Sequence, residues 1–159
     1  MIHYKTAKLF EAAARLGGIL AQVSPAQEEA LARYGMHLGT AFQLIDDVLD
    51  YSGDSATIGK NLGDDLAEGK MTLPLIQALR VANASQAALI RNTINAAEET
   101  TPDFAAVLAV IKVTDALAHT QARAAQEAAL AQEALQILPA TSARAILQEL
   151  AAFAVERDF

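Results

Sequence analysis

The stretch from Ser24 to Gly53 constrains the fold more than any other part of this chain. It contains no proline after Pro25, and its apolar residues recur at helical spacing. Ser24 is a preferred N-cap residue, Pro25 suits the first helical position, and Gln27 completes a capping box. Gly53 is typical of a helix end. The pattern therefore predicts a single helix of roughly seven turns.

The composition of the chain agrees with a fold made of helices. Its 159 residues are the usual size of one compact domain. Hydrophobic residues make up 53% of the sequence and aromatic residues only 5%, which favours helices over strands. We therefore expect an all-α fold without strands or internal repeats. Its further helices should cover about residues 2–22, 74–83, 85–98, 103–138 with a break near 112–115, and 142–155.

Charge, cysteine content and hydropathy exclude several functional classes. The formal net charge is −7, and the sequence lacks the basic patch of a nucleic-acid-binding protein. Cysteine is absent, which rules out disulfides and thiolate metal sites. The longest apolar run, residues 104–111, is too short to span a bilayer. Glu11 and Arg15 stand where a signal peptide needs an apolar core, so we expect a cytoplasmic protein.

Three aspartates interrupt the apolar sequence near the end of the long helix. On a helical wheel Asp46, Asp47 and Asp50 fall on the same side as Gly39 and Gln43, and apolar residues cover most of the remainder. No Lys or Arg stands four residues away to offset the like charges. Carboxylates in an apolar surround raise one another's pKa and cost stability, so we expect a positive group to bind there.

A hard cation suits these carboxylates best, because no His or Cys accompanies them in the row. Mg²⁺ keeps several waters and commonly bridges one or two carboxylates to phosphate oxygens, so the aspartates predict a diphosphate-bearing ligand. The simpler alternative is an Ala-rich bundle whose aspartates face water and bind neither Mg²⁺ nor diphosphate.

Lysines in two other segments fit a phosphate site. Lys5 precedes Thr6 near the start of the first helical segment, and Lys60 and Lys70 lie in the glycine-rich stretch of residues 53–74. An ammonium group is a compact charge suited to phosphate oxygens, and glycines let a loop close over a ligand. Taken singly, each lysine is more typical of a solvated surface charge.

Three motifs in order, "KTAKLFEAA", "GTAFQLIDDVLDY" and "GKNLGDDLAEGKMTLPLI", resemble those of the trans-isoprenyl diphosphate synthases. Within that family the chain is most similar to the long-chain, octaprenyl-type bacterial enzymes of quinone side-chain biosynthesis. The resemblance implies an antiparallel all-α bundle of the isoprenoid-synthase type, a Mg²⁺ cofactor and a homo-oligomer. It also implies head-to-tail condensation of isopentenyl diphosphate with an allylic diphosphate.

The resemblance assigns roles to individual residues. The implied catalytic residues are Lys5, Thr6, Gln43 and Asp46. The implied diphosphate ligands are Lys5, Lys60 and Lys70, and the implied Mg²⁺ ligands are Asp46, Asp47 and Asp50. In this scheme Thr6 and Gln43 place oxygen dipoles near the allylic cation. Asp65 matches the family's loop motif without a specific role, and Met71 stands where relatives often have proline.

One part of the family pattern is missing from this sequence. Family members carry two aspartate-rich motifs on facing helices, whereas only one is found here. Members are also about twice as long, so the resemblance makes residues 1–159 the C-terminal part of one helical domain whose N-terminal half is absent. We expect such a fragment to lack catalysis alone and to self-associate through helix faces that the absent helices would cover.

Two other functional classes stay open. A cyclising terpene synthase also uses aspartate-rich Mg²⁺ sites, although the Lys5–Thr6 pair and the glycine-rich loop motif argue against it. The second class is a non-catalytic helical subunit that pairs with a complete synthase. Such a subunit would have little reason to keep the lysines together with the row of aspartates.

Overall fold

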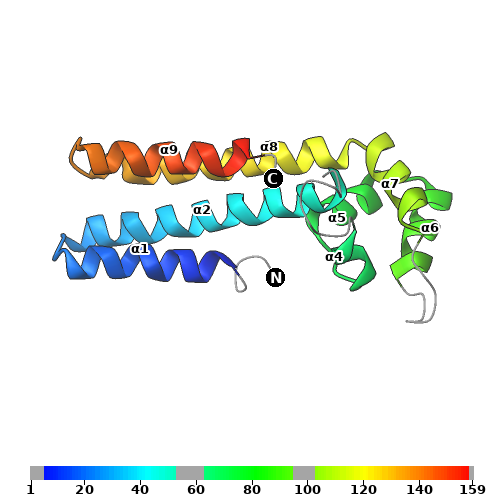
Figure 1. Cartoon of the computed structure of the whole chain (residues 1–159), viewed down its shortest axis with the longest axis horizontal. Helices are drawn as coiled ribbons and strands as arrows, with labels where there is room; N and C mark the ends of the chain where they lie inside the picture. Colours follow the sequence, from blue (N-terminus) through cyan, green and yellow to red (C-terminus); the bar gives the residue numbers. More distant parts are fainter. Residues whose placement is uncertain (1–5, 53–62, 95–102, 158–159) are drawn as a thin grey trace. The chain divides into compact units, whose positions relative to one another are not determined.

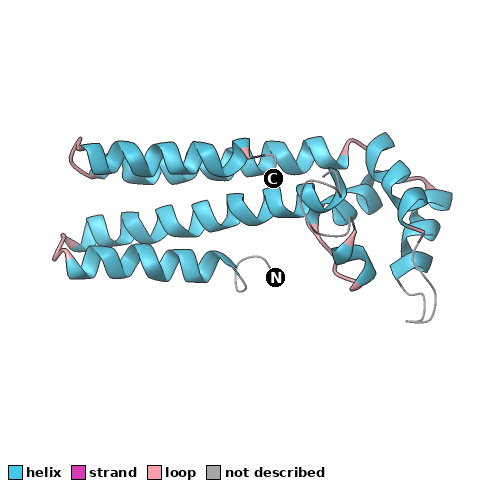
Figure 2. Cartoon of the chain, in the orientation of Figure 1, coloured by secondary structure: helices cyan, strands magenta, loops and turns pink. Residues whose placement is uncertain are grey.

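The computed structural model describes residues 6–52, 63–94 and 103–157, and helices account for most of them (Figure 1, Figure 2). No strand occurs within these three ranges, which confirms the all-α class. The helices are α1 (Lys8–Leu20), α2 (Pro25–Ser52), α4 (Asp64–Ala67), α5 (Leu73–Val81), α6 (Ala84–Ile94), α7 (Phe104–Val113), α8 (Ala116–Ala134) and α9 (Ser142–Glu156), with a 3₁₀ turn, η2 (Leu135–Ile137), after α8.

Side-chain caps begin several of these helices where the sequence predicts them. In the capping box of α2, the Ser24 main-chain N–H donates to Gln27 Oε1 at 3.1 Å, and the Gln27 N–H donates to Ser24 Oγ at 3.4 Å. Thr141 caps α9 through its side chain. Asp103 caps α7 by accepting a main-chain N–H three residues later at 3.0 Å, whereas the predicted cap at residues 101–102 lies outside the described residues.

Left-handed backbone marks three further boundaries. The predicted break between α7 and α8 is confirmed, and Asp115 has a φ of 51° there. The first helix ends at Leu20, slightly earlier than predicted, and Gln22 has a φ of 53°. The glycine-rich stretch of residues 53–74, which the sequence indicates is a loop or a broken helix, contains the single-turn helix α4, which follows Gly63 with a φ of 82°.

The chain divides into two compact units, and the first comprises residues 1–45 with residues 122–157. In this unit α1 and α9 run alongside the unit's portions of α2 and α8 (Figure 1). The helices of this unit approach closely because half of the residues in its core cluster are alanines. The cluster comprises Tyr34, Leu38, Ala131, Leu135, Ala151 and Ala154. The Tyr34 hydroxyl donates to the Leu147 carbonyl at 2.9 Å, and burial raises the pKa of Tyr34 to about 12.

The second unit comprises residues 46–121 with residues 158–159. Its core surrounds Tyr51, near the end of α2, and contains large side chains from α4 to α7: Leu66, Leu75, Ile90, Val107 and Ile111. The Phe104 ring stacks on the Tyr51 ring with 6.2 Å between centroids and 12° between planes. This packing fixes the end of α2 against the segment that follows Gly63.

A buried carboxylate on α8 is paired with α2 inside the first unit. Glu127 is only 5% exposed, and its Oε2 lies 2.6 Å from His37 Nδ1. Arg123 pairs with the other carboxylate oxygen. Because a buried carboxylate is costly without partners, this contact holds α2 and α8 in one register.

Large apolar side chains remain exposed on two helices of the first unit. On α1 they include Leu9 and Leu20, which are 73% and 84% exposed; on α9 they include Ile146 and Phe153. Such faces are compatible with the predicted self-association, which stays a prediction. Within the described ranges, no helix combines the length and apolarity needed to cross a membrane.

Candidate functional site

Thr6 and Gln43, to which the family resemblance assigns one role, contact each other in the first unit. Thr6 Oγ1 donates to Gln43 Oε1 at 2.7 Å, and both side chains are half-buried. The residues are 37 positions apart in the sequence, so the bond depends on how α1 packs against α2. Lys5 and Lys60 lie outside the described residues.

Two glycines of α2 allow α1 to come this close. A Cβ added at Gly39 would lie 2.8 Å from the Ala7 Cα, and one added at Gly35 would lie 2.7 Å from the Phe10 carbonyl carbon. Both positions therefore need a residue without a side chain. Sequence reasoning placed Gly39 beside Gln43 but missed the packing role of both glycines; their four-residue spacing on one helix face was the available signal.

The three aspartates on α2 are buried to different extents. Asp47 is 2% exposed, and Asp46 and Asp50 are half-buried. In the part of the chain that is described, no group of three or more His, Cys, Asp or Glu side chains could hold a metal ion. Asp46, Asp47 and Asp50 thus do not form a ready-made site of three carboxylates, whereas Mg²⁺ in proteins commonly takes one or two carboxylates and completes its shell with water and phosphate oxygens.

Asp50 accepts hydrogen bonds from two residues of the segment that begins at Gly63. Its main-chain carbonyl accepts the Gly63 N–H at 2.9 Å, and its Oδ2 accepts the Asp65 N–H at 3.3 Å. Burial, followed by the negative charge of Asp65, raises the pKa of Asp50 to about 6. A carboxylate held in this state gains from a nearby cation, which is the chemical property expected of a metal ligand.

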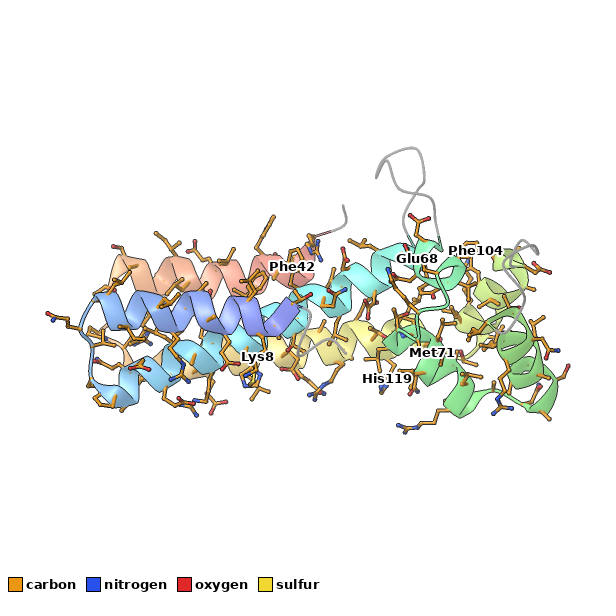
Figure 3. All side chains as sticks on the ribbon, turned by 90° about the horizontal axis from the view of Figure 1, so that it is seen from below. Lys8, Phe42, Glu68, Met71, Phe104 and His119 are labelled. Carbon is orange, nitrogen blue, oxygen red and sulfur yellow. The ribbon has the colours of Figure 1, made fainter. Side chains whose placement is uncertain are left out.

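Lys70 is paired with acidic residues of its own segment. Its Nζ lies 3.0 Å from Asp65 Oδ1 and 2.6 Å from Glu68 Oε2, and its main-chain N–H donates to the Asp65 carbonyl at 2.8 Å. The hydrogen bond to Glu68, and then that to Asp65, raises the pKa of Lys70. Glu68 and Met71 are both labelled in Figure 3, and Met71 is 40% exposed.

Comparisons with known proteins, by sequence and by structure, identify the family of this helical chain. The architecture is that of the isoprenoid synthases. The sequence model described as polyprenyl synthetase matches residues 1–111, and the chain belongs to that family.

Curated relatives give the same result over the full length of this chain. It is 47% identical over 159 residues to an octaprenyl diphosphate synthase of Haemophilus influenzae, covering 100% of this chain and 48% of the relative. It is 48% identical over 161 residues to the octaprenyl diphosphate synthase of Escherichia coli, covering 99% and 49%. The chain thus spans about half the length of the curated relatives it matches.

Solved structures of relatives contain divalent metals and isoprenyl diphosphate. A polyprenyl synthase from Caulobacter crescentus, complexed with calcium and isoprenyl diphosphate, is 45% identical with a TM-score of 0.92 and coverage of 99% of this chain and 48% of that one. A geranylgeranyl pyrophosphate synthase from Corynebacterium glutamicum, complexed with isoprenyl diphosphate and magnesium, is 35% identical with a TM-score of 0.86 and coverage of 98% and 44%.

Proposed function

We propose that this chain forms part of an octaprenyl-type polyprenyl diphosphate synthase, which condenses isopentenyl diphosphate head to tail with an allylic diphosphate. The main observation that supports the proposal is the row of aspartates on α2. The segment that begins at Gly63 packs against this row through two hydrogen bonds to Asp50. The identity to octaprenyl diphosphate synthases supports the long-chain class.

The proposed roles follow from the chemistry of each side chain. One or two of the carboxylates of Asp46, Asp47 and Asp50 would hold Mg²⁺, which would neutralise charge on the departing diphosphate. Lys5, Lys60 and Lys70 would hold the same diphosphate, Lys70 by exchanging its carboxylate partners for phosphate oxygens. Thr6 and Gln43 would direct oxygen dipoles at the allylic carbon as positive charge develops there. Apolar surroundings would keep water from that carbon.

The proposal has further parts that rest on the family resemblance. They are Mg²⁺ as the physiological metal, a role in quinone side-chain biosynthesis, a homo-oligomeric state and a cytoplasmic location. Because the chain spans about half of its relatives, the proposal also includes that these 159 residues need further helices for catalysis.

Replacing Asp46 with asparagine is expected to weaken Mg²⁺-dependent binding of inorganic pyrophosphate by roughly tenfold or more, because one of the few metal ligands loses its charge. Calorimetric titration with pyrophosphate, with and without Mg²⁺, measures this directly. The matched control is Asp103→Asn, since asparagine caps a helix as well as aspartate does and the same charge is removed. Equal affinities of the two variants for pyrophosphate, or wild-type binding that does not depend on Mg²⁺, would contradict the proposal.

Asp50 is expected to make the stability of the ligand-free chain depend on pH. Its pKa is raised from 3.8 to about 6, so the folded state holds this proton more tightly than the unfolded state. The cost of the ionised carboxylate is therefore full above pH 6, decreases as the pH falls from 6 to 3.8, and is absent below 3.8. With allowance for solvent screening of a half-buried group, the cost is roughly 1 to 2 kcal/mol.

The Asp50→Asn variant isolates this contribution, because its side-chain oxygen can still accept the Asp65 N–H. Thermal melts should show the variant more stable than the wild type at pH 8, and the difference should nearly vanish at about pH 4. A difference that is the same at both pH values would mean that Asp50 does not titrate in this range.

A further inference from the structure

Arg157, the residue that follows α9, contacts Phe42 of α2 in two ways. Its Nη2 donates to the Phe42 carbonyl oxygen at 2.7 Å. Its guanidinium carbon lies 3.8 Å from the centroid of the Phe42 ring. One planar group thus uses its face on the ring and its edge on the carbonyl. Phe42 lies beside the C-terminal end of α9 (Figure 3).

The residue held in this way adjoins the Thr6–Gln43 pair. The Phe42 carbonyl and the Gln43 N–H belong to one rigid peptide plane, so a bond to the carbonyl restrains Gln43 as well. The Phe42 ring also lies 5.8 Å from the Phe10 ring on α1, with 34° between planes. Arg157 and Phe10 therefore hold Phe42 from two different helices.

We propose that Arg157 is a positioning residue that fixes the Phe42–Gln43 peptide and thereby the side chain of Gln43. The proposal deepens the function proposed above and rests on it, because Gln43 matters for catalysis only if the chain contributes to a prenyl synthase. Arg157 thus acts on Gln43, which is 114 positions earlier in the sequence, through its contact with Phe42 and without touching substrate itself.

Lysine cannot replace arginine in this arrangement. Its ammonium group can lie over an aromatic ring or donate to a carbonyl, but it lacks the planar fork that allows both contacts at once. Arg157→Lys should therefore fail to restore Gln43 although the charge is kept. The alternative is that Arg157 only anchors the end of α9, in which case its replacement would leave Gln43 unchanged.

Arg144 provides a matched control on the same helix. It also donates to a main-chain carbonyl, that of Leu138 at 2.9 Å, and to Gln136 Oε1 at 2.6 Å. Both of these partners precede α9, whereas Arg157 follows it, so the Arg144 bonds lie at the opposite end of the helix from the Arg157–Phe42 contact. A variant of Arg144 thus removes an arginine hydrogen bond to a main-chain carbonyl near α9 and leaves the Arg157–Phe42 contact intact.

The test follows Gln43 by NMR in the ¹⁵N-labelled full chain, with the side-chain amide assigned from Gln43→Glu. We expect Arg157→Lys and Arg157→Ala to shift the Gln43 side-chain signals toward those of exposed glutamines. Exchange of the Gln43 main-chain amide should become roughly tenfold faster, as loss of a charged hydrogen bond predicts. Arg144→Lys should lower the melting temperature and leave both Gln43 readouts unchanged.

Phe42→Leu supplies a second variant that keeps the carbonyl and removes the ring. It should shift the Gln43 side-chain signals in the same direction, by less than Arg157→Ala does. Unchanged Gln43 signals in the Arg157 variants, or equal changes in the Arg144 and Arg157 variants, would overturn the positioning role. Titration of the same samples with Mg²⁺ and pyrophosphate reports separately on the proposed function, since these NMR readouts need no ligand.

Discussion

Replacing Gly35 with alanine is expected to lower the free energy of unfolding of the chain by at least about 2 kcal/mol. The new Cβ would overlap the Phe10 carbonyl and would lie 2.9 Å from the Glu11 Cα. Both are main-chain atoms, so no rotamer change can relieve the clash, and α1 must move away from α2. The Thr6–Gln43 hydrogen bond, which depends on that approach, should be lost as well.

The result is informative because alanine is normally the better helix former. Gly17, in the last turn of α1, has no heavy atom within 4 Å of an added Cβ. Gly17→Ala should therefore stabilise the chain by roughly 0.5 to 1 kcal/mol, as helix propensity predicts. Urea denaturation followed by circular dichroism measures both variants. If the two substitutions changed stability in the same direction, tight packing of α1 on Gly35 could not be the cause.

Local signals in the sequence were sufficient to predict most helix ends. The capping box of Ser24 and Gln27 and the break before α8 were predicted, and each depends on residues only a few positions apart. For the last helix the sequence predicts a cap at Thr141 or Ser142, and Thr141 is the residue that caps it. Such interactions are encoded within one turn of the chain. The bounds of α4 were not predicted, because the sequence of that stretch indicated only a loop or a broken helix, and the left-handed backbone of Gly63, rather than a side-chain cap, precedes its single turn.

Contacts between distant residues were predicted less well. The family motifs brought Thr6 and Gln43 into one proposed role, but nothing in residue spacing alone gave their hydrogen bond. The helical wheel placed the aspartates on one side of α2 without distinguishing the buried Asp47 from the half-buried Asp46 and Asp50. These differences arise from the elements that pack around α2, and a wheel contains no information about its neighbours.

The partners of the charged residues could not be predicted for a related reason. Lys70 was interpreted as a phosphate ligand, and in the ligand-free chain its charge is met by Asp65 and Glu68. The role of Arg157 was not predicted at all, since its contact with Phe42 joins residues 115 positions apart. Only the packing of α9 beside the middle of α2 brings those two residues together.

Replacing Gly63 with alanine is expected to detach α4 from the end of α2 and to cost about 2 to 4 kcal/mol of stability in the second unit. Gly63 has a φ of 82°, and an added Cβ would overlap the Cδ2 and Cε2 atoms of Phe104. The Phe104 ring cannot turn aside freely, because it is stacked on the buried Tyr51. The two hydrogen bonds that Asp50 receives should break together.

Gly69 separates the effect of the clash from that of the backbone conformation. It also has a positive φ, 67°, but an added Cβ would meet no heavy atom within 4 Å. Gly69→Ala should therefore cost only the backbone strain, about 1 kcal/mol. Hydrogen exchange of the main-chain amides of residues 63 and 65, compared between the two variants, identifies the broken bonds. Gly63→Ala should make both amides exchange faster, and Gly69→Ala should leave both protected. Protection of the Asp65 amide in Gly63→Ala would show that α4 stays on Asp50 and that the Phe104 ring yields instead.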